Sequence, residues 1–157
     1  MLRRMRAIRF HEQGPPEVLR LERIAPPAPP GRGEVLLEVR AASVNHLDIW
    51  VRRSLPNIPL PRIPGADAAG VVLQVGPGVT GVRPGQRVLI DPGFTTEDTI
   101  EVLRGEPSLS KAYGILGESC DGTYCERLVV PARSCLPIPA GWSFAQAAAF
   151  PLTALTA

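Results

Sequence analysis

The sequence contains few cysteines and lacks any long apolar run. Its 157 residues include only Cys120, Cys125 and Cys135, an odd number in which no pair has C-x-x-C spacing. This excludes a fully paired disulfide framework and argues against a finger-type zinc site, so we expect three reduced thiols in a cytoplasmic protein. No apolar run approaches the roughly 20 residues of a membrane helix. Residues 1–4 are not followed by the apolar segment of a signal peptide.

The sequence also lacks a strong excess of either charge. Lysine and arginine total 17 against 15 acidic residues, which gives a net charge of +2. This balance argues against a nucleic-acid-binding protein, which would carry a basic stripe or patch. Proline is abundant instead: the 18 prolines are about twice the average usage. Because proline interrupts helices and central strands, we expect short strands joined by turns.

The hydrophobic pattern supports this expectation. Alternating apolar residues predict strands at 5–10, 17–23, 34–42, 68–75, 87–91 and 122–131. Residues 44–53 and 95–104 are candidates for short helical stretches, and a helix begins after Ser143, whose hydroxyl forms a capping box with Gln146. We therefore predict a mainly β fold, a barrel or a sandwich, with short helices. The sequence shows no β-α-β alternation, so we expect a Rossmann domain to be absent from this chain.

Residues 76–81 match the pattern G-x-G-x-x-G of dinucleotide-binding loops. That pattern binds phosphate only where a helix begins within it. Pro84 and Gly85 follow too closely for such a helix. We interpret the glycines as turn residues.

Six spaced blocks of residues resemble one known family in the same order. They are 41–48 (AASVNHLD), 64–72 (PGADAAGVV), 75–79 (VGPGV), 82–88 (VRPGQRV), 122–126 (GTYCE) and 147–153 (AAAFPLT). The chain is thereby similar to the N-terminal catalytic domain of medium-chain dehydrogenases/reductases, the family of alcohol dehydrogenases and quinone oxidoreductases. The resemblance implies a GroES-like, partly open β-barrel at 1–140. It also implies that 141–157 begin the helix leading to a nucleotide-binding domain missing from this chain.

The resemblance implies that both zinc sites of the family are lost. The three catalytic ligands fall at Asn45, Ala66 and at or near Ala149. An amide oxygen is a poor zinc ligand and alanine is none, whereas a catalytic site needs about three protein ligands. The four cysteine positions of the structural zinc site fall at Thr96, Thr99, Val102 and Ser110. We therefore predict that the protein binds no metal.

The same resemblance nominates site residues, each with a structural alternative. Asn45 would donate to a developing oxyanion or merely form a turn. Asp48 would orient the site, or be a charge at the helix start or a buried partner. These two are the catalytic candidates.

The remaining candidates would contact the substrate or the cofactor. Ile49 and Trp50 would wall a substrate pocket or pack in the core, and Asp67 would bind substrate or hold structure. His46 would approach the cofactor phosphates and Thr153 the nicotinamide; the alternatives are a surface histidine and a helix-start hydroxyl.

Three functional hypotheses follow. The first is a zinc-independent oxidoreductase that transfers hydride from NADPH or NADH to a quinone, enone or carbonyl, with a small molecule as its partner. The second is a zinc-type alcohol dehydrogenase that has lost its metal ligands, and the third is a non-catalytic GroES-like binding module. Without a nucleotide-binding domain we expect this chain alone to be inactive. We also expect it to self-associate through an exposed C-terminal segment.

Overall fold

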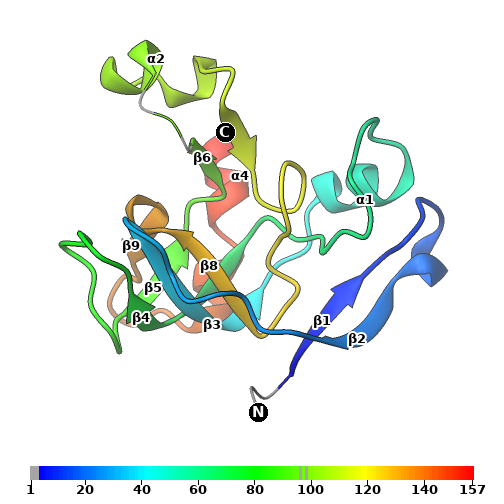
Figure 1. Cartoon of the computed structure of the whole chain (residues 1–157), viewed down its shortest axis with the longest axis horizontal. Coiled ribbons are helices and arrows are strands. Elements are labelled where there is room, and N and C mark those ends of the chain that lie inside the picture. The colour runs from blue at the N-terminus through cyan, green and yellow to red at the C-terminus, as the bar shows by residue number, and fades with distance from the viewer. Residues whose placement is uncertain (1–3, 96, 98) are drawn as a thin grey trace.

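A five-stranded antiparallel sheet forms the centre of the molecule in the computed structural model, which describes residues 4–95, 97 and 99–157 (Figure 1). The strand order is β8-β3-β4-β5-β9. The strands are β3 (Glu34–Ala42), β4 (Ala68–Val75), β5 (Arg87–Ile90), β8 (Arg127–Pro131) and β9 (Cys135–Pro137). Strands β8 and β9 are the two edges, which agrees with a barrel that is only partly closed.

Two antiparallel ribbons flank the sheet. One pairs β1 (Met5–Arg9) with β2 (Arg20–Ile24), and the other pairs β6 (Gly93–Thr95) with β7 (Tyr113–Ile115). The helices are short: α1 (His46–Arg53), α2 (Ile100–Leu103), α3 (Phe144–Ala148) and α4 (Pro151–Thr156), with 3-10 turns η1 (Pro16–Val18), η2 (Pro107–Leu109) and η3 (Ala132–Ser134). In the described ranges, no helix combines the length and apolarity needed to cross a bilayer.

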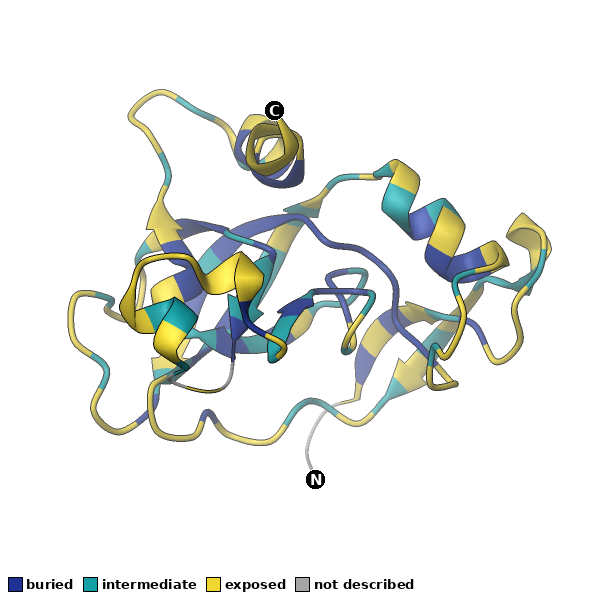
Figure 2. Cartoon of the chain, turned by 90° about the horizontal axis from the view of Figure 1, so that it is seen from above, coloured by how far each residue is buried: buried dark blue, intermediate teal, exposed yellow. Residues whose placement is uncertain are grey.

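Alternation along the strands produces two apolar layers. Val88 and Ile90 of β5 point into the main core with Val35, Leu37 and other strand residues, and all four are fully buried. Leu89 lies between Val88 and Ile90 in the sequence and packs instead with residues of α3. Small side chains there, among them Ala147 and Ala148, let α3 approach the sheet closely. Figure 2 shows dark blue residues interspersed with teal and yellow ones along the sheet, whereas α4 is exposed beyond Leu152.

The structure confirms most of the predicted elements. Strands β3 and β4 have the predicted bounds, and Ser143 caps α3 with Gln146 as expected. Residues 76–86 form turns in which Gly78, Gly81 and Gly85 have positive φ, and no helix begins there, as the turn interpretation requires.

Other predicted elements differ in extent. The strand expected at 17–23 is β2 at Arg20–Ile24, and of the helical stretch expected at 95–104 only Ile100–Leu103 form α2. For two further elements the contacts give the reason. Only Arg127–Pro131 of the expected strand 122–131 joins the sheet, because Gly122, Thr123 and Tyr124 donate their backbone N–H groups to the carbonyls of residues 63–65. The helical C-terminal segment is two helices, α3 and α4. Pro151 lacks a backbone N–H and therefore begins a new helix.

Candidate active site

The site is built where β3 ends and α1 begins. Asn45 is the N-cap residue of α1, with extended dihedrals of φ −118° and ψ 160°. The carboxylate of Asp48, three residues later, accepts the Asn45 backbone N–H at 2.8 Å. A carboxylate at this position also interacts favourably with the positive end of the helix. The predicted helical stretch is thus confirmed. The hydrogen bond between Asp48 and the Asn45 backbone holds Asn45 at the start of α1.

Asp48 connects three distant segments. Besides Asn45, its carboxylate accepts the backbone N–H of Gly65 at 3.0 Å and the hydroxyl of Tyr124 at 2.9 Å. The side chain is buried, and burial raises the pKa of Asp48 despite these hydrogen bonds, which act in the opposite direction; the charge of Asp67 raises it further. Burial also raises the pKa of the Tyr124 hydroxyl, with the Asp48 charge adding to it, so this hydroxyl is a donor.

Asp67 is the second buried carboxylate and is 0% exposed. One oxygen accepts the Ser43 hydroxyl and the Asn45 side-chain amide, each at 2.9 Å. The other accepts the backbone N–H of Leu152 at 2.8 Å, which anchors the start of α4. Both oxygens therefore have donors, and the carboxylate is held by three hydrogen bonds from two segments of the chain.

Gly65 allows these segments to pack closely. Its φ is +101°, and an added Cβ would collide with the side chains of Thr123 and Tyr124. Thr123 is fully buried, and its hydroxyl donates to the backbone carbonyl of Asp67 at 2.9 Å. Because Gly65 has no side chain, residues 122–124 can lie directly beside it. Its backbone N–H can at the same time donate to the Asp48 carboxylate.

Four other predicted site residues lie outside these networks. His46 and Trp50 are exposed on α1, and their rings interact with centroids 5.0 Å apart. Thr153 is exposed on α4. Ile49 lines a hollow together with the turn at residues 14–16, and none of the other predicted site residues lines it. The structure therefore brings Asn45, Asp48 and Asp67 together and leaves Ile49 on a separate surface.

The residues at the family's catalytic zinc positions do not fit a zinc ion. Ala66 is fully buried, Ala149 is an exposed C-cap residue, and neither carries a donor atom. The Asn45 amide donates to Asp67, whose oxygens already have partners. Within the described residues, no three His, Cys, Asp or Glu side chains are grouped as a metal site would require.

The positions of the structural zinc site have other partners. Thr99 caps α2 by accepting the Val102 backbone N–H, and the Ser110 hydroxyl accepts the backbone N–H of Ala112. Thr96 lies outside the described residues. Hydroxyl and aliphatic side chains at the three described positions are not zinc ligands of the usual kind.

Sequence reasoning assigned no role to several residues of the networks. Tyr124 and Thr123 belong to a block that was used only to recognise the family, and Ser43 to another. The sequence marks these residues only by their place in blocks that resemble the family. Their partners, however, lie 24 to 81 residues away in the chain, so spacing could not reveal the contacts.

Known proteins support the assignment of this fold. Residues 31–140 match the model of the alcohol dehydrogenase GroES-like domain. The chain is 35% identical over 127 residues to a zinc-type alcohol dehydrogenase-like protein of Schizosaccharomyces pombe, covering 80% of this chain and 35% of that protein. It is 32% identical over 150 residues to quinone oxidoreductase 1 of Escherichia coli, covering 95% and 38% respectively.

A solved structure gives the same result. The crystal structure of an NAD-dependent alcohol dehydrogenase superposes with a TM-score of 0.92 at 46% identity, covering 97% of this chain and 45% of that one. The chain thus spans less than half the length of each of these relatives. With the fold, the family model and these relatives in agreement, the chain belongs to the alcohol dehydrogenase GroES-like domain family of the medium-chain dehydrogenases/reductases.

Proposed function

We propose that this chain is the substrate side of an NAD(P)H-dependent oxidoreductase that transfers hydride to a quinone, enone or carbonyl compound without zinc. The observation that carries the proposal is the contact between Asn45 and Asp67. By the resemblance, Asn45 stands at a position that ligates the metal in zinc-type members, and here its side-chain amide donates to Asp67. The relatives that carry oxidoreductase names support the reaction class.

Asn45 is the candidate that would touch the substrate. Its side-chain amide has two N–H bonds, and one of them is directed to the buried carboxylate of Asp67. That bond fixes the plane of the amide. The second N–H is then available to donate to a substrate oxygen, where negative charge develops as hydride is added. Asn45 is half-buried, so a substrate can reach it.

Asp48 and Asp67 are positioning residues in this proposal. Asp48 fixes the backbone of Asn45 and the start of α1, whereas Asp67 fixes the Asn45 amide. Neither needs to exchange a proton with substrate, because each carboxylate already accepts three hydrogen bonds. A substrate-binding role for Ile49 or Asp67 gains no support from this geometry, since Asp67 is fully buried and Ile49 lines a separate hollow.

The nicotinamide cofactor, NADPH or NADH, supplies the hydride when it is bound. In this chain His46 and Thr153 are the residues that would contact it, whereas Trp50 would wall the substrate pocket. All three are exposed, and within the described residues none of their side chains has a hydrogen-bond partner. The relatives extend well beyond the matched segment, so we assign most of the cofactor contacts to a nucleotide-binding part outside these 157 residues.

The apolar C-terminal segment supports a proposed self-association. Phe150 and Leu155 are each 50% exposed, and Trp142 packs edge-on against Phe150. Burying such side chains is favourable, which would drive two copies together through this segment. Analytical ultracentrifugation of the chain and of Phe150→Ser with Leu155→Ser tests this. A monomer at all concentrations for the unsubstituted chain would contradict it.

A zinc-type alcohol dehydrogenase is the second candidate, favoured by the name of the Schizosaccharomyces pombe relative. The test measures the natural polypeptide that contains these residues. After exhaustive chelation, oxidation of NADPH and NADH is followed with a quinone, an enone and an aldehyde. We expect activity to survive chelation and metal analysis to find no stoichiometric zinc. Activity lost on chelation and restored by zinc would establish the second candidate instead.

Asn45→Ala separates catalysis from mere binding. We expect kcat to fall about 100-fold with little change in KM, the size typical for loss of an oxyanion donor. Asn45→Asp removes the N–H donors at similar volume and should be equally impaired. If no assay detects hydride transfer by the unsubstituted polypeptide, the non-catalytic binding module becomes the better account.

A further inference from the structure

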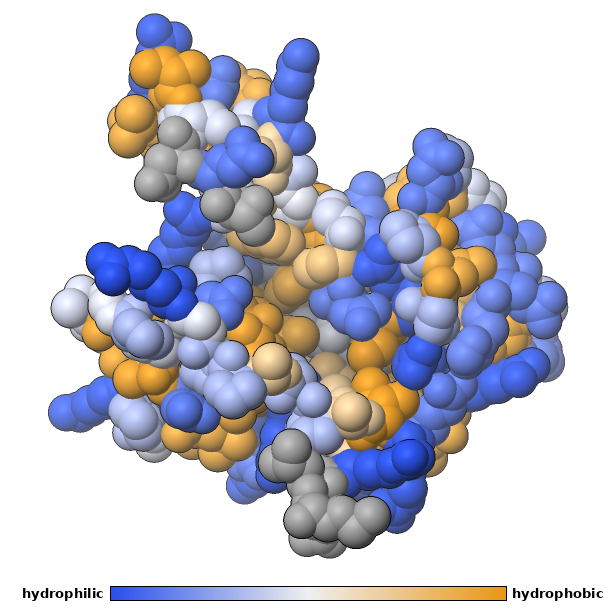
Figure 3. Space-filling model, in the orientation of Figure 1, coloured by the Kyte–Doolittle hydropathy of each residue, from blue (hydrophilic) through white to orange (hydrophobic). Residues whose placement is uncertain are grey.

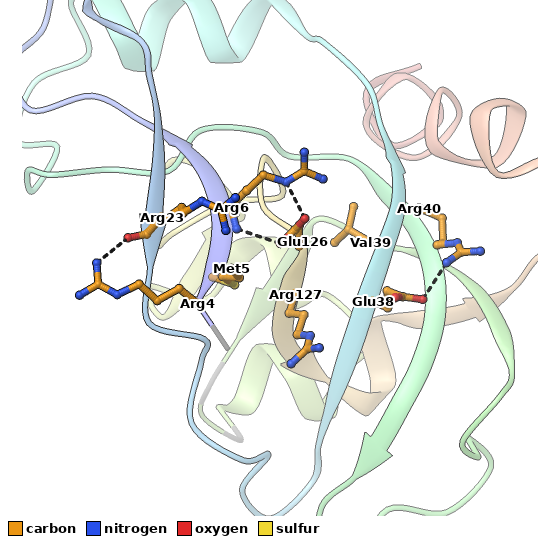
Figure 4. A pocket seen from close by; sticks show the side chains of 9 residues that line it. All are labelled: Arg4, Met5, Arg6, Arg23, Glu38, Val39, Arg40, Glu126 and Arg127. Carbon is orange, nitrogen blue, oxygen red and sulfur yellow. Dashed lines mark hydrogen bonds and ion pairs between the residues drawn. The ribbon is translucent and has the colours of Figure 1, made fainter. Parts of the chain in front are cut away.

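A hollow of about 440 Å³ lies between the β1–β2 ribbon and strands β3 and β8 (Figure 4). Its lining is dominated by arginine: Arg4, Arg6, Arg23, Arg40 and Arg127. Two glutamates, Glu38 and Glu126, are the acidic residues of the lining. None of these seven residues belongs to the networks around Asp48 and Asp67. The hollow is therefore a feature that the proposed oxidoreductase function does not use.

Positive charge is concentrated in this hollow. Five guanidinium groups face two carboxylates there, although the whole chain carries a net charge of only +2. The net positive charge of the lining residues, five arginines against two glutamates, is thus larger than the net charge of the whole chain. The strand register adds to it, because Arg6 lies directly opposite Arg23 in the β1–β2 ribbon. Like charges in directly opposed positions destabilise a strand pair, so folding alone does not account for them.

The glutamates satisfy only part of this charge. Arg6 forms an ion pair with Glu126 at 2.7 Å, and Arg40 with Glu38 at 3.0 Å. Figure 4 shows both pairs as dashed lines, together with the bond from Arg4 to the backbone carbonyl of Arg23. Over the described part of the chain, the guanidinium groups of Arg23 and Arg127 make no hydrogen bond or ion pair. Arg4 likewise has no carboxylate partner there.

We propose that this hollow is a binding site for a small phosphorylated anion. A guanidinium group presents several N–H donors in a planar fork that matches the oxygens of a phosphate. Arg23 and Arg127, whose guanidinium groups have no partner among the described residues, line the hollow and would supply the donors to one such group. The volume lies within the range of small-molecule sites. The two ion pairs hold Arg6 and Arg40 in place at the rim, and the small area and the near-neutral molecule do not suit a nucleic acid.

Titration of the full chain with inorganic pyrophosphate tests the proposal, by calorimetry at constant ionic strength. We expect one saturable site with a Kd below about 1 mM. Orthophosphate and AMP form two further arms. Equal binding of AMP and orthophosphate identifies a bare phosphate ligand, and tighter binding of AMP identifies a nucleotide. Citrate serves as a carboxylate polyanion. Binding of citrate as tight as that of pyrophosphate, or no saturation by pyrophosphate, overturns the proposal.

Variants connect the binding to this hollow. Arg23→Gln with Arg127→Gln should weaken pyrophosphate binding about tenfold or more, because two charge-assisted donors are lost. Arg83→Gln with Arg104→Gln is the matched control, because it removes the same charge from two exposed arginines outside the hollow, and its affinity should stay within about twofold. Glu38→Gln removes a competing carboxylate and should tighten binding about threefold.

The Glu38→Gln result does not depend on loss of structure, because a misfolded chain would bind more weakly. Far-UV circular dichroism and the thermal midpoint confirm that each variant is folded. If Arg83→Gln with Arg104→Gln weakens binding as much as Arg23→Gln with Arg127→Gln, the interaction is diffuse attraction to net charge. That outcome, or weaker binding by Glu38→Gln, rejects a site in the hollow.

Discussion

The candidate active site and the lobe at residues 93–119 show two different ways of holding a polypeptide together. At the site, two buried carboxylates accept donors from segments up to 85 residues apart. In the lobe, the hydrogen bonds of Thr99 and Ser110 reach two or three residues along the chain, and a longer one, from Arg133 to the Thr95 hydroxyl, spans 38. Ile100, Leu103 and Leu109 are exposed there, and Figure 3 shows apolar side chains on the lobe's surface, at the upper left. Substitutions should therefore affect the site strongly and the lobe weakly.

Asp67→Ala should have the largest effect. It leaves donors from Ser43, Asn45 and Leu152 without an acceptor in a buried place. Since each unsatisfied buried group costs about 1–3 kcal/mol, we expect the free energy of unfolding in urea to fall by about 4 kcal/mol. The matched lobe variant, Glu101→Ala on α2, should change it by less than about 0.5 kcal/mol. Similar losses for both would remove the distinction between the two regions.

Gly65→Ala and Gly105→Ala compare two glycines with positive φ. Both require a conformation that alanine adopts only with strain, at φ +101° and +80°. An added Cβ collides with Thr123 and Tyr124 at Gly65, whereas nothing lies within 4 Å of it at Gly105. Backbone strain costs about 1 kcal/mol at either position, and the collision should add about 2 kcal/mol at Gly65 alone. Thermal unfolding of both variants measures the difference, and equal losses would show that the 122–124 segment yields easily.

Tyr124→Phe should cost about 1–2 kcal/mol at neutral pH, because ionised Asp48 loses a donor. Tyr113→Phe in the lobe is the control. It is half-buried, and within the described residues its hydroxyl has no hydrogen-bond partner, so we expect a change below about 0.5 kcal/mol.

The pH dependence follows from Asp48, whose pKa is raised by burial. A raised pKa means that the folded protein binds this proton more tightly than the unfolded chain. The associated stability is therefore present in full below the unfolded pKa, and it is lost as pH rises through the folded pKa. Tyr124→Phe disfavours the ionised form, so its cost should shrink as pH falls below the folded pKa of Asp48. A cost that does not shrink as pH is lowered would show that the hydroxyl does not act through Asp48.

The regular parts of this fold were predictable from the sequence, whereas the contacts of the site were not. Strands β3 and β4 are runs rich in Val, Leu and Ala that lie between turn residues, Gly33 and Ser43 for β3 and Asp67 and Gly76 for β4, so the pattern sets their bounds. The strand predicted at 122–131 also includes residues 122–124, but their N–H groups bond to the loop before β4. These hydrogen bonds form because Gly65 has no side chain, which lets residues 122–124 approach residues 63–65 closely.

The site residues show the same limit. The resemblance predicted that Asn45 and Asp67 belong to one site. The local spacing predicted that Asp48 lies at the start of α1. Tyr124 was missed because its role depends on a carboxylate 76 residues away. Ile49 directly follows the buried Asp48 on α1, where successive side chains are turned by about 100°, and it lines a hollow with residues 14–16; its substrate-binding role stays a prediction.

Leu103→Ser in the lobe should have the smallest effect on the free energy of unfolding. Leu103 is 75% exposed and lies on α2, so little apolar surface is lost from the core. We expect the free energy of unfolding to change by less than about 0.5 kcal/mol.

Leu152→Ser, at the start of α4, is the matched leucine of the site; it is 8% exposed and should cost about 3 kcal/mol. Urea denaturation of both variants decides the point. If Leu103→Ser destabilises the chain as much as Leu152→Ser, the lobe contributes packing that its exposed surface conceals, and the contrast between long-range and local bonding fails.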